Sequence, residues 1–158
     1  MSDIRVGIGV DAHAFAEGVP LVLGGIRFDA PRGLAGHSDG DVITHALIDA
    51  LLGAAGLGDI GSLFPSNSST PEGISSLDLL RDALSQVRDA GYSVANADCV
   101  LIGEQPRIAD RRSEMEEILS GAVGAPVSVR ATTTDQLGFT GRREGLAAQA
   151  VALVERRY

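Results

Sequence analysis

Lysine is absent from the chain, so all 13 of its basic side chains are arginines, and a Schiff-base or lysine-nucleophile mechanism is excluded. The sequence contains a single cysteine, Cys99, which rules out an internal disulfide framework and indicates a reducing compartment. Long hydrophobic runs are also missing. The longest run of apolar residues and glycine, from Ala50 to Gly58, is far shorter than the roughly 20 residues that span a bilayer.

Positive charge is scarce, because 21 acidic residues outweigh the 13 arginines and give a net charge of −8. Such a chain is a poor general binder of nucleic acid or of an anionic membrane, so neither is expected as a partner. A bound phosphate ester would have to be neutralised locally, by metal ions, a few arginines and backbone N–H groups. The first residues, Met1–Arg5, lack the basic and apolar regions of a signal peptide, and we expect a cytoplasmic protein.

The length of 158 residues suits one domain, and we expect residues 1–158 to form it. Alternating apolar residues predict strands, and apolar stripes at helical spacing predict helices. The two kinds of element alternate coarsely along the chain, which indicates an α/β sandwich. The expected strands are Arg5–Asp11, Leu21–Phe28, Tyr92–Ile102 and Val127–Thr133, and the glycines in the middle of Leu21–Phe28 suit a bulge or a turn. The expected helices are Asp41–Ala55, Ser76–Ala90, Ile108–Leu119 and Glu144–Arg156.

The three histidines, His13, His37 and His45, are concentrated between positions 13 and 45. The spacing Asp11-x-His13 at the end of a strand places both side chains on one face, which is otherwise glycine and would leave room above it. His45, on the following helix, can supply a third ligand. Two imidazoles and one carboxylate with an open fourth position form the catalytic type of zinc site.

The ligand types leave a second metal open, since two histidines and a carboxylate also form the facial triad of non-haem Fe(II) oxygenases. Asp41, His45 and Asp49 share one helical row. A carboxylate one turn from His45 could orient its other ring nitrogen, and our hypothesis gives this role to Asp49 or Asp41. The alternative for each histidine alone is structural, with His13 ending a strand and His45 lying on a helix surface.

The segment 131–142, ATTTDQLGFTGR, follows the end of an expected strand. Threonine hydroxyls and exposed N–H groups suit phosphate oxygens. The carboxylate of Asp135 suits a hard cation such as Mg²⁺ that bridges to phosphate. From these residues alone, a β-branched strand followed by an ordinary turn is the alternative.

Four segments together resemble one family: Asp11-Ala-His13, the block HSDGDVITHALIDALLGAAGLGDIG from His37 to Gly61, Phe64-Pro65, and ATTTDQLGFTGR. They are similar to the 2-C-methyl-D-erythritol 2,4-cyclodiphosphate synthases of the non-mevalonate isoprenoid pathway, in order, from about Arg5 to Val154. The resemblance implies an α/β (α+β) two-layer sandwich with a mixed sheet packed on helices. It further implies a homotrimer with active sites between adjacent subunits.

The activity implied by the resemblance is that of a phosphorus–oxygen lyase, which cyclises 4-diphosphocytidyl-2-C-methyl-D-erythritol 2-phosphate and releases CMP. The implied cofactors are one Zn²⁺ per subunit, bound by Asp11, His13 and His45, and a second divalent cation, Mg²⁺ or Mn²⁺, at Asp135. His37 and Thr133 match the residues that stabilise the transition state.

The substrate contacts implied by the resemblance lie in several loops, and one of these loops reads the cytosine through backbone groups. The loop that reads the cytosine comprises Gly103, Glu104, Gln105, Pro106, Arg107, Ile108 and Ala109. The other contacts are Asp11, His13, His37, Ser38, Asp59, Ile60, Gly61, Phe64, Pro65, Ser66, Asn67, Ser68, Thr132, Thr133, Thr134, Asp135, Phe139 and Arg142.

Several positions depart from the family pattern, among them Arg107 and Arg130, which stand where Lys is usual. Ser66, followed by Asn67, stands where an acid is common, Asp135 replaces a usual Glu, and Gln149 replaces a frequent Glu near the trimer axis. The departures at Ser66 and Asp135 leave one alternative, a catalytically idle relative that only binds a nucleotide or an isoprenoid diphosphate. The Fe(II) oxygenase is disfavoured by the threonine segment and by the order Asp-x-His. The intact triad and Thr133 predict an active synthase.

Overall fold

The computed structural model describes residues 2–158, and their centre is a mixed β-sheet. Within these residues five strands pair in the order β4-β1-β7-β5-β6. Strands β1 and β7 pair antiparallel, as do β5 and β7, whereas β5 and β6 are parallel. The strands are β1 (Ile4–Glu17), β4 (Arg32–Leu34), β5 (Tyr92–Ile102), β6 (Val127–Thr132) and β7 (Gly145–Arg156).

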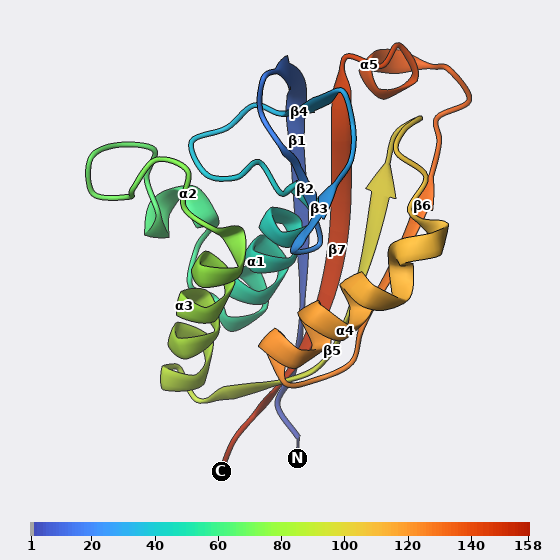
Figure 1. The fold of residues 1–158 in the computed structure, drawn as a ribbon. Coiled ribbons are helices and arrows are strands. Elements are labelled where there is room, and N and C mark those ends of the chain that lie inside the picture. The colour runs from blue at the N-terminus through green and yellow to red at the C-terminus, as the bar shows by residue number, and fades with distance from the viewer. Residues whose placement is uncertain (1) are drawn as a thin grey trace.

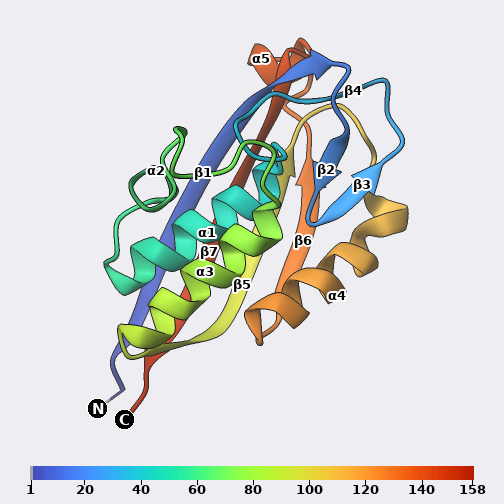
Figure 2. The same cartoon turned by 60° about the vertical axis from the view of Figure 1, so that its left-hand side comes forward.

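Three helices cover one face of this sheet and form the second layer (Figures 1 and 2). They are α1 (Val42–Ala55), α3 (Ser76–Asp89) and α4 (Arg112–Val123). The smaller elements are the hairpin of β2 (Leu21–Leu23) and β3 (Ile26–Phe28), the short helices α2 (Ile60–Leu63) and α5 (Gly138–Gly141), and the 3-10 turn η1 (Ala109–Arg111). The expected mixed sheet packed on helices is confirmed. Across residues 2–158, no helix has the length and apolar character needed to cross a membrane.

Helix α1 lies directly on strand β1, and two glycines of β1 make this close approach possible. A Cβ atom added to Gly9 would lie 1.9 Å from the backbone oxygen of Ala46, and one added to Gly7 would lie equally close to that of Ala50. The glycine face of the strand therefore carries the helix backbone and leaves no empty space there. The room expected above this face is filled by α1, which brings His45 down to the strand.

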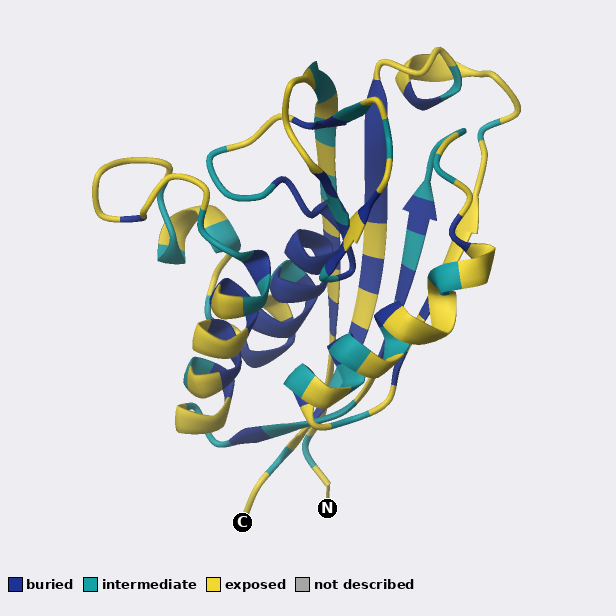
Figure 3. Ribbon diagram, viewed as in Figure 1, coloured by how far each residue is buried: buried dark blue, intermediate teal, exposed yellow. Residues whose placement is uncertain are grey.

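The opposite face of the sheet is apolar yet uncovered in the described chain. Figure 3 shows β7 banded with alternating buried and exposed residues, as expected for a strand whose faces differ. On β1 the outward side chains Val6, Ile8 and Val10 are 66%, 66% and 58% exposed, and Val151 of β7 is 46% exposed. A row of large apolar side chains in water is typical of a surface that another protein covers.

The expected helix Glu144–Arg156 is wrong, because Gly145–Arg156 forms the central strand β7. Alanine favours helices, so helix propensity alone predicts a helix for this alanine-rich segment. Its buried residues nevertheless alternate, with Ala148, Ala150 and Ala152 facing the helices, and both of its edges pair with neighbouring strands. Tertiary pairing overrides the local preference here. The segment Leu21–Phe28, expected as one strand with a bulge or turn at its glycines, forms two short strands, and the hairpin β2–β3 turns at Gly24 and Gly25.

Candidate metal centre and substrate site

Strand β1 and helix α1 bring Asp11, His13 and His45 together. The Nε2 atom of His13 lies 2.7 Å from Oδ2 of Asp11, and Nδ1 of His45 lies 3.0 Å from the same oxygen. The two ring nitrogens are 3.1 Å apart. The side chains of Asp11 and His13 are 25% and 19% exposed, and that of His45 is 8% exposed, so the cluster opens to solvent on one side.

This triangle of donor atoms fits a divalent metal ion. Zinc bonds of about 2.0–2.1 Å in a tetrahedron hold neighbouring ligand atoms about 3.3 Å apart, so only a small expansion of the observed triangle is needed. Two imidazole nitrogens and one carboxylate oxygen are the donor set of catalytic zinc, and the open side leaves space for a fourth ligand. The grouping predicted from the sequence is therefore present.

The second nitrogen of each imidazole has a protein partner that fixes the ring. The Nδ1–H group of His13 donates to the backbone oxygen of Ala35 at 2.6 Å, which leaves Nε2 free to bind a metal. On His45, Nε2 lies 2.8 Å from Oγ of Ser76 and 2.9 Å from Oγ of Ser38, while Nδ1 points at the triad. With these partners on the other side, each ring could present an unprotonated nitrogen to a metal ion at the same point.

The hypothesis that Asp41 or Asp49 orients His45 is wrong. Asp41 is fully buried and caps α1. Its oxygens accept hydrogen bonds from the amides of Gly24 at 2.9 Å, Gly25 at 2.8 Å and Thr44 at 3.1 Å. Asp49 accepts from the amide of Ile60 at 2.7 Å and so holds the start of α2. Both acids organise the site's scaffold and do not contact His45 through any of these bonds.

Charge is concentrated at the triad. Burial raises the pKa of Asp11, but hydrogen bonds from His13 and His45 outweigh burial and lower that pKa to about 2. The hydrogen bond to Asp11 raises the pKa of His13 above its usual value, against the opposing effect of burial. The metal-free cluster therefore holds an ionised carboxylate beside an imidazole that readily keeps its proton, and a metal cation would take the place of that proton.

A cavity of about 120 Å³ adjoins His45 and gathers many of the predicted substrate contacts. Its lining includes His37 and Ser38, whose loop precedes α1, and the segment around α2. Sequence reasoning missed two lining residues, Thr70 and Leu79, and nothing in their local pattern singles them out. The backbone oxygen of Thr70 accepts a hydrogen bond from Nε2 of His37 at 2.5 Å. The other predicted residues in the lining are Ile60, Gly61, Phe64 and Ser66.

Other predicted contacts of this region serve the loops themselves. Asp59 caps α2 by accepting from the amide of Ser62 at 2.8 Å. Asn67 accepts from the amide and the hydroxyl of Ser69, so its side chain is used within its own turn. Pro65 and Ser68 belong to the same exposed loop but are not among the residues that line this cavity.

The predicted cytosine loop and the threonine segment lie side by side at the ends of the parallel strands β5 and β6. The amide of Gly103 donates to the oxygen of Thr132 at 3.0 Å, and the amide of Gln136 donates to Glu104 at 3.2 Å. The hydroxyl of Thr133 lies 3.4 Å from Oδ1 of Asp135. Three threonines and one carboxylate thus share a loop. The cytosine loop continues through Gln105, Pro106, Arg107, Ile108 and Ala109 into η1.

This second group does not reach the triad within one chain. The strand register places Thr132 opposite Ile102, Ile102 opposite Ala147, and Ala147 opposite Ala12, which lies between Asp11 and His13. The two groups are therefore level with each other but three strand spacings apart, about 14 Å at roughly 4.8 Å per spacing. The structure therefore holds the triad and the threonine segment as two separate groups on one sheet.

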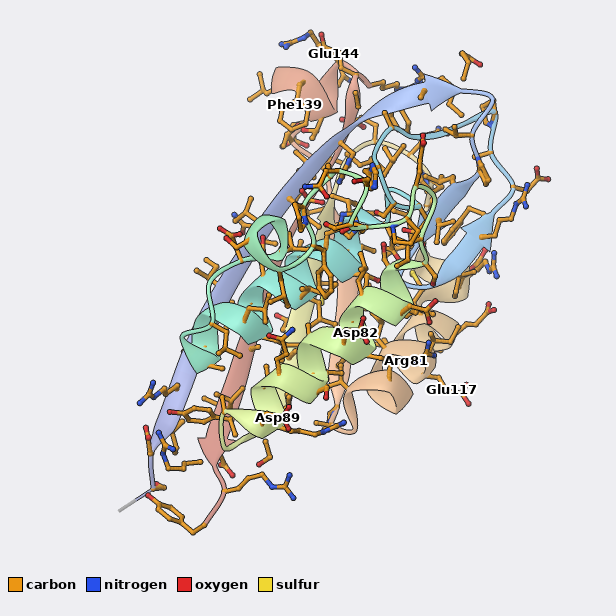
Figure 4. All side chains as sticks on the ribbon, turned by 90° about the vertical axis from the view of Figure 1, so that its left-hand side faces the viewer. Arg81, Asp82, Asp89, Glu117, Phe139 and Glu144 are labelled. Carbon is orange, nitrogen blue, oxygen red and sulfur yellow. The ribbon has the colours of Figure 1, made fainter. Side chains whose placement is uncertain are left out.

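Phe139 and Arg142 lie next to the threonine segment, because the hydroxyls of Thr134 and Thr140, 2.9 Å apart, join that segment to α5. They lie in and after α5, and Figure 4 shows Phe139 and Glu144 at the end of the sheet opposite the chain termini. Arg142 forms an ion pair with Glu144 at 3.0 Å, and both side chains are largely exposed. Neither Phe139 nor Arg142 lines the cavity beside His45.

Comparison with known proteins supports a relationship over nearly the whole chain. The model of the YgbB family matches residues 4–155. A 2-C-methyl-D-erythritol 2,4-cyclodiphosphate synthase of Rubrobacter xylanophilus is 54% identical over 162 residues, which cover 99% of this chain and 98% of that protein.

Solved structures agree with this relationship. The bifunctional IspDF of Campylobacter jejuni matches with a TM-score of 0.94 at 38% identity, covering 99% of this chain and 43% of that longer chain. A CDP complex of IspF from Plasmodium falciparum matches with a TM-score of 0.84 at 31% identity, covering 98% of this chain and 97% of that one.

Proposed function

The chain belongs to the YgbB family, and from this membership we propose that it is a 2-C-methyl-D-erythritol 2,4-cyclodiphosphate synthase. Residues 1–158 form one synthase domain whose substrate is 4-diphosphocytidyl-2-C-methyl-D-erythritol 2-phosphate. The observation that carries the proposal is the triangle of Asp11, His13 and His45, with donor atoms 2.7–3.1 Å apart beside a cavity. A cytoplasmic location stays a prediction.

The reaction is an intramolecular phosphoryl transfer. An oxygen of the 2-phosphate forms a bond to the β-phosphorus, and the bond from that phosphorus to the oxygen bridging to the α-phosphorus breaks. CMP leaves with the electron pair of that bond, and a cyclic diphosphate remains. The attacking phosphate oxygen is already ionised, so no general base is needed. Catalysis then rests on placing the reacting groups in line and on neutralising charge.

The chain's own residues hold the reacting groups. Asp11, His13 and His45 would hold Zn²⁺, and Asp135 would hold Mg²⁺ or Mn²⁺. Together these ions supply Lewis acids that neutralise the phosphate oxygens. His37 lies in the wall of the cavity, where its ring is fixed through Nε2 by the carbonyl of Thr70, and it stabilises charge that develops on the phosphates.

The residues of the cavity wall bind the methylerythritol chain. Ser38 offers a hydroxyl there, while the loop from Asp59 to Ser68 closes the other side through Ile60, Gly61, Phe64 and Ser66. A flexible substrate has to fold so that its two phosphorylated ends meet. A small cavity of about 120 Å³ next to the triad favours such a folded conformation.

The two halves of the site are joined by a second copy of the chain in our proposal. The register places Thr132, the residue before Thr133, about 14 Å from the triad across the sheet, too far for both halves of one chain to contact the same pair of phosphates. The cytosine loop lies on the side of Thr133, so the nucleotide would extend toward a neighbouring subunit. The exposed apolar residues Val6, Ile8 and Val10 suit burial between subunits, which supports a homotrimer with shared sites.

The proposal is tested by incubating the protein with the authentic substrate, Zn²⁺ and Mg²⁺. Release of CMP and appearance of the cyclic diphosphate are followed by phosphorus NMR. Asp11→Asn is the matched control, because it keeps the size of the side chain but removes a charged ligand. We expect the unmodified protein to convert the substrate and the Asp11→Asn variant to show no conversion. Binding of substrate without conversion would refute the synthase, and metal analysis that finds iron at the triad would refute the zinc site.

A further inference from the structure

A buried serine, distant from His45 in the sequence, contacts the ring nitrogen of His45 that points away from the triad. Ser76 is the first residue of α3 and is completely buried. Its Oγ atom lies 2.8 Å from Nε2 of His45, on the side of the ring that faces away from the triad. We propose that Ser76, backed by Asp39, is a positioning residue that fixes the orientation and tautomer of His45 and thereby sets the affinity of the metal site.

The hydrogen bonds around Ser76 define which atom donates. Its hydroxyl is in short contact with Oδ1 of Asp39, and its amide donates to Oδ2 of the same carboxylate at 3.0 Å. An ionised carboxylate only accepts, so the single hydrogen of the hydroxyl goes to Asp39. The oxygen of Ser76 is then free to accept from Nε2–H of His45. When a metal takes the place of the hydrogen between Nδ1 and Asp11, this arrangement keeps a hydrogen on Nε2 and leaves Nδ1 with a lone pair for the metal.

Ser38 is less suited than Ser76 to fix the orientation of His45. Its Oγ atom also lies 2.9 Å from Nε2 of His45, but a neutral ring has one hydrogen to give at that position. Ser38 lines the cavity and is a proposed substrate contact. Ser76 is not among the residues that line that cavity, and its hydroxyl is bonded to the carboxylate of Asp39, so it remains the constant partner of His45 while Ser38 can turn to the substrate.

Asp39 is itself held firmly by the backbone. Its amide donates to the oxygen of Ile74 at 3.1 Å, and its Oδ1 atom accepts from the amide of Asp41 at 3.1 Å. These bonds tie the loop before α1 to the start of α3. The carboxylate therefore braces Ser76 at a fixed place relative to α1, which carries His45. The metal site is supported from α3, an element that supplies none of its ligands.

The inference rests on the proposed function only in requiring that the triad binds zinc. The zinc dissociation constant of the metal-free protein is measured by competition with a chromogenic chelator. Ser76→Ala is expected to weaken zinc binding by about 10–100-fold, the usual effect of losing a residue that orients a ligand. Ser75→Ala is the matched control, because the neighbouring Ser75 makes no side-chain capping bond and should leave the constant unchanged.

Two further variants separate positioning from simple stabilisation. Ser76→Thr retains the hydroxyl and should restore zinc binding to within a few-fold. Ser38→Ala should weaken zinc binding less than Ser76→Ala does. Urea unfolding of each metal-free variant reports stability independently, and the zinc constant of Ser76→Ala should change by far more than its unfolding midpoint explains.

The outcomes distinguish this inference from the proposed function. If the unmodified protein binds no zinc, the proposed function and this inference both fail. If it binds zinc and Ser76→Ala binds equally tightly, only the role of Ser76 is refuted. A larger loss in Ser38→Ala, or a well-folded Ser76→Thr that does not recover affinity, would also overturn it. The comparison of Ser76→Ala with Ser75→Ala tests the role of Ser76 even if the threonine variant does not fold.

Discussion

Two variants that each lack one half of the site are predicted to restore activity when they assemble together. The first carries Asp11→Asn and lacks a ligand of the triad. The second carries Thr133→Ala and Asp135→Asn and lacks the groups at the end of β6. Asparagine suits position 135, where φ is 52° and the backbone is left-handed. Each variant alone is expected to lose activity while retaining its fold.

The size of the expected recovery follows from the strand register. Because the two groups are about 14 Å apart on one chain, we expect a working site to take its triad from one subunit and its threonine loop from a neighbour. In rings that form at random from an equal mixture, the first subunit has an intact triad half of the time and its neighbour has an intact loop half of the time. About one quarter of the sites should then be complete, with about one quarter of normal activity, if the assembly is cyclic with head-to-tail contacts.

The assay unfolds and refolds the two variants together in equal amounts and measures CMP release from the substrate. Variants refolded separately and pooled just before the measurement provide the control for residual activity. Recovery near one quarter is expected only in the sample that was refolded together. If that sample stays at the level of the pooled control while forming mixed oligomers, the site lies within one chain and the argument from the register is refuted.

Three smaller predictions test the packing, the electrostatics and the cysteine. Gly9→Ala should lower the free energy of unfolding by about 1–3 kcal/mol, because its Cβ would lie 1.9 Å from a backbone oxygen of α1. Gly121 lies in α4, and a Cβ atom added there would meet nothing within 4 Å, so Gly121→Ala should raise that free energy by up to about 1 kcal/mol. Both variants are measured by urea unfolding, and equal unfolding midpoints for the two would contradict the packing of α1 on β1. The raised pKa of His13 in the metal-free protein means that its charged form stabilises the fold below pH 6.5 and that this contribution is lost as the pH rises through the raised value. Zinc binds the neutral ring, so its affinity should increase over that interval with release of protons, and calorimetry showing no proton release would contradict this. Burial raises the pKa of the Cys99 thiol to about 12, so a thiol reagent should leave the native protein unlabelled and label it on unfolding; rapid native labelling would refute the burial.

Local patterns in the sequence predicted the parts of the site that lie on single elements. The spacing of Asp11 and His13 places both on one face of β1, because side chains of a strand alternate. Helix α1 follows its capping residue Asp41 and carries His45 in its first turn. These features depend on neighbours within a few residues, so the triad could be expected from the sequence and from the family resemblance.

Local patterns misled where distant pairing decided the structure. The alanines of Gly145–Arg156 favour a helix by themselves, and only pairing with β1 on one side and β5 on the other makes this segment a strand. The acids on the row of His45 looked like its partners by spacing. Asp41 instead binds the turn at Gly24 and Gly25, because the hairpin β2–β3 packs there.

The sequence by itself thus determined the ligand types, their spacing and the helix that carries the third ligand. Only the tertiary structure placed Ser76 behind His45, although 31 positions separate them in the chain. It alone set Thr133 and Asp135 three strands away from the triad. Both results depend on the order and register of strands and on which helix lies against which. Contacts between distant segments determine this order, register and packing, which the short-range periodicity of the sequence does not predict.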